Sequence, residues 1–159
     1  MAEIINTATA SEIFNMICSS LDKLKIKYEK NDVDLSVKCV IFGRDIPIDT
    51  KLYVDIENKL IVFQSNLKTV FPPEKIVNAA VAINAVNFNV IDGAFGLDVL
   101  NGTVDFKLSC SFEERQVTND LVAYIILCSF NTVDAVNDKL EQLLKEEIEL
   151  EEFVKNFGY

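Results

Sequence analysis

This 159-residue chain contains no histidine, so any acid–base chemistry would use Asp, Glu, Tyr or Lys side chains. Without histidine, serine and cysteine triads and the usual zinc sites lose a required member. Close carboxylate pairs at Asp45 and Asp49 and at Glu113 and Glu114 could act as general acid and base. Such pairs arise by chance among 25 acidic residues, and both lie in loop-like sequence. We therefore interpret them as solvated charge and predict no catalytic residue.

The four cysteines, Cys18, Cys39, Cys110 and Cys128, are far apart and form no C-x-x-C pair. Each has apolar neighbours, and a free cysteine packs as a small hydrophobic side chain. We predict four reduced thiols in the core. The same observations predict no disulfide, no metal and no cofactor.

Two pairs of residues in the middle of the chain could contact a ligand. Asn84 and Asn87 could present their amides, but we favour a role in capping a helix end and bonding the loop at 89–93. Gly93 and Gly96 form G-x-x-G, which leads into a strand-like sequence and not into the helix N-terminus that binds phosphate. We interpret these glycines as backbone freedom at a strand entry.

The one basic cluster consists of Lys23, Lys25, Lys27 and Lys30, near the end of the first predicted helix. Cations there interact favourably with the helix dipole. A docking patch for an acidic partner, or for the chain's own acidic tail, is the alternative interpretation.

Length and charge narrow the class of protein. At this length we expect one domain with its own core. The net charge of −10 would repel a phosphate backbone, so we predict no nucleic-acid or membrane partner. Residues 1–10 lack the basic start of a signal peptide, and no apolar run approaches ~20 residues. We expect a cytoplasmic protein.

Hydrophobic periodicity predicts the first elements. Apolar residues recur every three or four positions from Ser11 to Tyr28, which predicts an amphipathic helix. They alternate from Val33 to Ile41, which predicts a half-buried strand with both of these residues facing inward.

The next elements are a predicted hairpin and a helix. The hairpin joins residues 52–56, with Ile56 facing inward, to residues 60–64. The helix begins at Pro72-Pro73, since proline is tolerated in a first turn, and is apolar on nearly every side over 76–88.

The clearest alternation is a hairpin over residues 95–112 with a turn at Asn101-Gly102. One face is predicted to be dry and contains Phe95, Leu97, Val99, Val104, Phe106 and Leu108. The opposite face contains Asp98, Asp105 and Lys107.

A long third helix is predicted to follow, with Thr118 as its N-cap. Its acidic end should stay helical through the i,i+4 pairs Glu141 with Lys145 and Glu151 with Lys155. The order is α-β-β-β-α-β-β-α. We therefore predict a single α+β domain in which an antiparallel sheet has helices packed on it.

Three successive segments also carry a family pattern, namely Phe71-Pro72-Pro73-Glu74-Lys75, Ala82-Ile83-Asn84-Ala85-Val86-Asn87-Phe88 and Asp92-Gly93-Ala94-Phe95-Gly96-Leu97-Asp98. With the order of elements, they resemble the YbjN family, which shares its fold with the type III secretion chaperones. The resemblance covers about residues 10–145, and Gly96 replaces a bulkier polar residue. It implies an antiparallel sheet flanked by helices, a homodimer, and binding of other proteins in place of catalysis. We predict a YbjN-like α+β domain over 1–146 and an acidic helical extension over 147–159.

The predicted middle and third helices are apolar around most of their circumference, yet one sheet covers only one side of each. A second copy could cover the rest, because a two-fold interface uses one patch twice. Candidate contact residues for a dimer or a client are Val77, Val81 and Tyr124. A third apolar stripe, Leu150, Val154 and Phe157, could fold back on its own subunit or reach a partner.

The sequence supports three hypotheses about the function. The leading hypothesis is a dimeric, non-enzymatic chaperone or adaptor that holds a segment of another polypeptide. The second is a regulatory or structural dimerisation module whose partner is a folded protein. The third is a small-ligand or enzymatic domain that uses only Asp, Glu, Tyr and Lys, and the missing histidine and phosphate loop argue against it.

Overall fold

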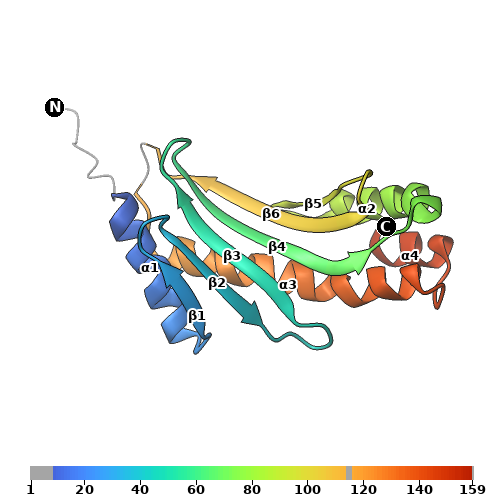
Figure 1. Ribbon diagram of the computed structural model, residues 1–159, viewed down its shortest axis with the longest axis horizontal. Helices are drawn as coiled ribbons and strands as arrows, with labels where there is room; N and C mark the ends of the chain where they lie inside the picture. The colour runs from blue at the N-terminus through green and yellow to red at the C-terminus, as the bar shows by residue number, and fades with distance from the viewer. Residues whose placement is uncertain (1–8, 114–115, 159) are drawn as a thin grey trace.

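The computed structural model describes residues 9–113 and 116–158 (Figure 1). Glu114, a member of one predicted carboxylate pair, lies outside the described residues. The elements are α1 (Ala10–Lys23), β1 (Tyr28–Asn31), β2 (Ser36–Ile41), β3 (Ile48–Asp55), β4 (Leu60–Val70), the 3-10 helix η1 (Pro73–Lys75), α2 (Ile76–Asn89), β5 (Ala94–Leu97), β6 (Thr103–Ser111), α3 (Asn119–Leu144) and α4 (Leu150–Gly158).

The six strands form one sheet in the order β1-β2-β3-β4-β6-β5, and every neighbouring pair is antiparallel. Helix α3 runs along the sheet and contacts β3, β4 and β6, while α1 packs against α3 and β3 (Figure 1). Helix α2 lies against β5, and α4 lies against α2. The predicted fold class, a single α+β domain with an antiparallel sheet and packed helices, is confirmed.

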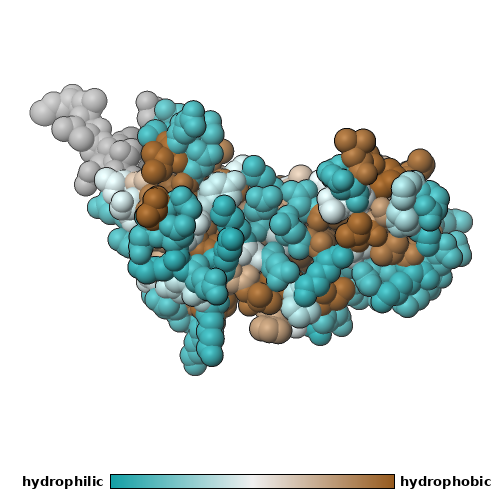
Figure 2. All heavy atoms as spheres, viewed as in Figure 1, coloured by the Kyte–Doolittle hydropathy of each residue, from teal (hydrophilic) through white to brown (hydrophobic). Residues whose placement is uncertain are grey.

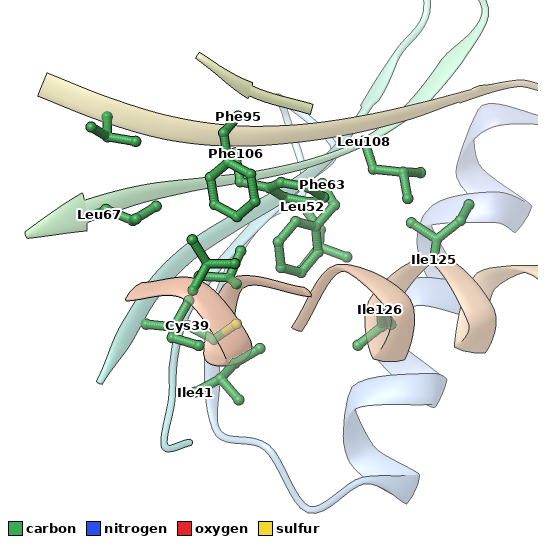
Figure 3. Close-up of a cluster of buried hydrophobic side chains, with 14 of the residues drawn as sticks. Cys39, Ile41, Leu52, Phe63, Leu67, Phe95, Phe106, Leu108, Ile125 and Ile126 are labelled. Carbon is green, nitrogen blue, oxygen red and sulfur yellow. The ribbon is translucent and has the colours of Figure 1, made fainter. Parts of the chain in front are cut away.

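The core lies between the sheet and α1 and α3 (Figure 3). The rings of Phe63 and Phe95 flank Phe106, with centroids 6.3 and 5.0 Å from it. The predicted dry face of the second hairpin is confirmed at Phe95, Phe106 and the two buried residues Val104 and Leu108. Leu97 and Asp105 are half-buried, and Asp98 and Lys107 are exposed. The predicted inward position of Val99 is wrong, because β5 ends at Leu97 and Val99 lies 60% exposed in the turn.

The predicted first helix is too long. Helix α1 ends at Lys23, and Tyr28 begins β1. The chain turns at Lys25, whose φ is +57°, and the amides of Lys25 and Ile26 donate to carbonyls in the last turn of α1. This turn closes the helix end as a glycine often does. A strand that was not predicted therefore follows.

The predicted inward position of Val33 is also wrong. Val33 is 90% exposed, in the turn between β1 and β2. The side-chain oxygen of Asn31 accepts bonds from the amides of Val33 and Asp34, which closes this turn. Asparagine competes in this way with continued strand pairing. At the end of β3, Ile56 is likewise 52% exposed in a turn and does not face inward.

The third helix is divided into two. Thr118 caps α3 as predicted, by accepting a bond from the amide of Leu121. Helix α3 ends at Leu144, and Glu146 adopts φ +60°. Helix α4 then begins at Leu150, so the tail is helical but separate. Both predicted tail ion pairs are present: Lys145 lies 3.1 Å from Glu141, and Lys155 lies 2.7 Å from Glu151.

Candidate functional site

Helix α2 presents a mostly apolar outer face, on which the exposed Asn84 lies between Val81 and Phe88. Its inner face is buried and consists of Ala79, Ala82, Ile83, Ala85 and Val86. The opposite face contains Val77, Val81 and Phe88, which are 73%, 45% and 77% exposed, and Ile91 follows at 92%. Steps of four and seven residues keep Val77, Val81 and Phe88 on one side of α2, and Ile91 lies in the loop after the helix ends at Asn89. We call these four residues the α2 surface, and hydrophobic side chains gather over this end of the molecule in Figure 2.

Tyr124 of α3 lies close to the end of the α2 surface. Its ring is 47% exposed, and its hydroxyl donates to the carboxylate of Asp92, next to Ile91. This bond raises the pKa of Tyr124. Leu127, one turn further along α3, is also partly exposed. The bond places the predicted contact residue of α3 beside the loop that follows α2.

The stripe Leu150, Val154 and Phe157 lies on α4, which packs against α2 of its own chain. All three side chains are half-buried. Between them lies Phe153, which is fully buried, with its ring centroid 4.8 Å from that of Phe157. The side chain of Asn89, at the end of α2, donates to the carbonyl of Phe157. Sequence reasoning missed Phe153, although its spacing of three and four residues from Leu150 and Phe157 places it on the same face.

Lys75 joins the start of α2 to the end of α3. Its ammonium lies 2.7 Å from the carbonyl oxygen of Leu144 and 2.8 Å from the carboxylate of Glu146. This ion pair lowers the pKa of Glu146. A cation at the carbonyl end of a helix is stabilising. Lys75 thus holds the first turn of α2 in position, so the α2 surface is carried on a fixed support.

The two asparagines of α2 have different surroundings. The side-chain amide of Asn87 bonds both backbone groups of Phe95 in β5, at 2.8 Å to the amide and 2.9 Å to the carbonyl. It therefore bonds an outer strand, and not the 89–93 loop of the sequence-based interpretation. Asn84 is exposed on α2.

Gly93 supplies backbone freedom at a strand entry, as the sequence predicted, whereas Gly96 lies within β5 and does not have a positive φ. Gly93 has φ +84°, and a Cβ there would lie 2.5 Å from the ring of Phe106. β5 begins directly afterwards, at Ala94.

Among the described residues, the candidate carboxylates and the cysteines do not converge on a site. Asp49 lies on β3, and Asp45 lies in the loop before that strand. All four cysteines are free, and burial raises the pKa of Cys39 to about 11. Across residues 9–113 and 116–158, no three cysteine, aspartate or glutamate side chains gather in a way that could hold a metal ion. No described helix has the length and apolarity needed to cross a bilayer.

A hollow of about 800 Å³ lies on the sheet face that α1 and α3 leave open. Residues of β1, β2, β3 and β4 line it, together with Lys27 before β1 and Phe42 after β2. Sequence reasoning missed this hollow, because its lining depends on which residues face each other across four strands.

No family model matches the chain, and no curated protein matches it. Several solved structures are similar to it, including the following three. YbjN from E. coli, described as a candidate transcription regulator, aligns with a TM-score of 0.61 and 17% identity, over 84% of this chain and 92% of that one. The ExsC–ExsE complex aligns with a TM-score of 0.52 and 13% identity, over 86% of this chain and 93% of that one. The HopA1–SchA chaperone–effector complex aligns with a TM-score of 0.41 and 15% identity, over 94% of this chain and 97% of that one.

The first two matches confirm the fold that the resemblance implied, which YbjN shares with type III secretion chaperones.

Proposed function

We propose that this chain is a non-enzymatic, protein-binding domain of the cytoplasm that acts as a homodimer and holds a segment of another polypeptide, as a chaperone or adaptor. The observation that carries the proposal is the α2 surface, with Val77, Val81 and Phe88 exposed on one side of the helix and Ile91 exposed in the loop that follows it. Contiguous exposed apolar patches on soluble proteins mark interaction sites more often than chance.

The arrangement suits a two-fold contact. One helix from each copy can lie against the other, so that a single patch is used twice. Tyr124, at the end of the α2 surface, and Leu127, one turn further along α3, would extend the contact to α3. The stripe on α4 is already half-covered by its own subunit, which leaves the α2 surface as the larger uncovered apolar area. In this proposal α2 forms the dimer.

The fold supports the protein-binding part of the proposal. ExsC has the same fold and was solved in a complex with ExsE. The alternative is a regulatory or structural dimerisation module that binds a folded partner. The likeness to YbjN, a candidate transcription regulator, favours this second function.

Sedimentation equilibrium at micromolar concentration tests the dimer. We expect about twice the chain mass of 17.9 kDa. Val81→Asp should reduce the mass to that of a monomer, because a buried unpaired carboxylate at an interface is costly. The matched control is Ile56→Asp, at a similarly exposed apolar residue in a distant turn, and it should remain dimeric. A wild-type mass near 17.9 kDa would contradict the dimer.

Affinity capture from cells separates the two functions. A bound partner that is protease-sensitive or awaiting secretion supports the chaperone or adaptor. A stoichiometric complex with a folded, protease-resistant partner supports the regulatory module.

A further inference from the structure

We propose that the hollow on the open face of the sheet binds an acidic segment of polypeptide with an apolar side chain next to its carboxylates. The inference rests on the proposed function, since it names the chemistry of the segment that the protein would hold.

The pairing of the strands builds the floor of the hollow. One row across β1, β2, β3 and β4 places Glu29, Lys38, Lys51 and Gln64 side by side. Lys38 and Lys51 face each other directly, on strands about 4.8 Å apart. Like charges directly opposite each other destabilise a sheet, and a carboxylate placed between them removes the repulsion.

The charged side chains that line the hollow form no close ion pair with other described residues. The cations in the lining are Lys27, Lys38 and Lys51, and the anions are Glu29 and Asp49. Among the described residues none of these five has an ion-pair partner within 4.0 Å. Lys51 has one attractive contact, with its ammonium 4.9 Å from the ring centroid of Tyr53. These charges therefore remain available to a partner.

The rim of the hollow is apolar. Val40 and Phe42, at the end of β2, are 44% and 78% exposed. The loop after Phe42 is held by Asp134 of α3, which accepts bonds of 2.9 and 3.0 Å from the backbone amide and the guanidinium of Arg44. An aromatic side chain exposed on a fixed loop loses little freedom on binding, and such side chains commonly anchor interfaces.

Charge and size select the occupant. Most of the chain's excess negative charge lies outside the hollow, because residues 76–159 hold 14 acidic and five basic residues. The lining of the hollow holds three cations and two anions. The net charge of −10 repels every anion in proportion to the charge of that anion, so a segment with one or two carboxylates meets less repulsion than a polyphosphate does. The volume of about 800 Å³ lies within the usual range of ligand sites.

Fluorescence anisotropy with the full chain tests the site. The probe is a labelled octapeptide containing two glutamates, a leucine between them and a phenylalanine after them, at low salt. We expect saturable binding that weakens as salt rises. The same peptide with glutamine in place of glutamate should bind about tenfold more weakly or worse, a change that corresponds to about 1.4 kcal/mol.

Three variants locate the binding. The double variant Lys38→Glu and Lys51→Glu should weaken peptide binding by about tenfold or more, and Phe42→Ser by about threefold or more. The control Lys59→Glu reverses an exposed lysine in the β3–β4 turn and should bind like the wild type. None of these residues is part of the buried core, so thermal melting should show all three variants folded.

Equal binding of the glutamate and glutamine peptides, or no effect of the double variant, would overturn the proposal. So would tighter binding of a single-stranded oligonucleotide or of inorganic pyrophosphate, because the site would then be a phosphate site. Failure here is distinct from failure of the proposed function. If the double variant still captures the wild-type partner from cells, only the assignment of the hollow falls, whereas a wild type that captures no protein refutes the function itself.

Discussion

The two faces of the sheet are made from alternate residues of the same strands, yet they are opposite in character. On one face, a row of Val37, Leu52 and Phe63 is fully buried under α1 and α3. In the adjacent row, one residue away on each strand, Lys38 and Lys51 are exposed and polar, and no described helix covers them (Figure 1). Because side chains alternate with a period of two, substitutions on one face can alter stability while those on the other alter binding. The following measurements test this division.

The largest effect should come from the buried face. Phe106 is fully buried between the rings of Phe63 and Phe95, so Phe106→Ala leaves a cavity at the centre of the core. We expect a loss of about 3–5 kcal/mol in the free energy of unfolding. Urea denaturation measures it. A variant that melted within a degree of the parent would mean that the strand register is wrong by one residue.

The next effect concerns β5, an outermost strand of the sheet, whose Phe95 is buried. Asn87→Ala removes both side-chain bonds to the backbone of Phe95. We expect a loss of about 1–3 kcal/mol, because partly buried backbone groups would be left without partners. Hydrogen exchange at the Phe95 amide should accelerate with it. Asn84→Ala, at an exposed asparagine of the same helix, is the control and should change stability by less than about 0.5 kcal/mol.

A smaller effect should depend on pH. Lys145 lowers the pKa of Glu141, and Thr69, a buried residue of β4, donates a 3.0 Å bond to the same carboxylate. A glutamate in an unfolded chain has a pKa of about 4.3. The stabilisation by Glu141 is therefore present above that pH and is lost as the pH falls through the lowered value.

Glu141→Gln tests this dependence and keeps an acceptor for Thr69. At pH 7 the variant should be less stable than the wild type by about 0.5–1 kcal/mol. At pH 3 the difference should shrink. A difference that grows toward low pH would contradict the assignment.

The smallest effect should come from the open face. Lys51→Ala should change the free energy of unfolding by less than about 0.5 kcal/mol, because the side chain is exposed and faces another lysine. Thermal melting at low and high salt measures this change. A loss above about 1 kcal/mol would show that the open face also supports the fold.

The sequence predicted best where one interaction dominates. The alternation around Phe106 and the cap at Thr118 depend on local spacing, and both are present. Strand β1 was missed because Tyr28 continues a helical spacing, and only the positive φ of Lys25 ends the helix. The break before α4 was missed because its turn uses Glu146 where glycine is usual.

Local spacing also predicted only part of the candidate sites. The exposure of Val77, Val81 and Tyr124 agrees with the argument that one sheet cannot cover helices apolar all round. The hollow could not be predicted, because the pairing of Lys38 with Lys51 depends on long-range register. Spacing along a chain shows which face of an element a residue occupies, but not which residue lies beside it on the next strand.

The place of β6 beside β4 has a consequence for folding. Strands β1 to β4 pair with their neighbours in sequence, but β4 waits for β6, and residues 71–102 separate the two. At a synthesis rate of 5–20 residues per second, those residues take about 2–6 s to make. During that time the edge of β4 that faces away from β3 has no strand beside it. The nascent chain therefore carries an unpaired edge, the kind of surface that recruits other strands, and its risk of aggregation is greatest before β6 emerges.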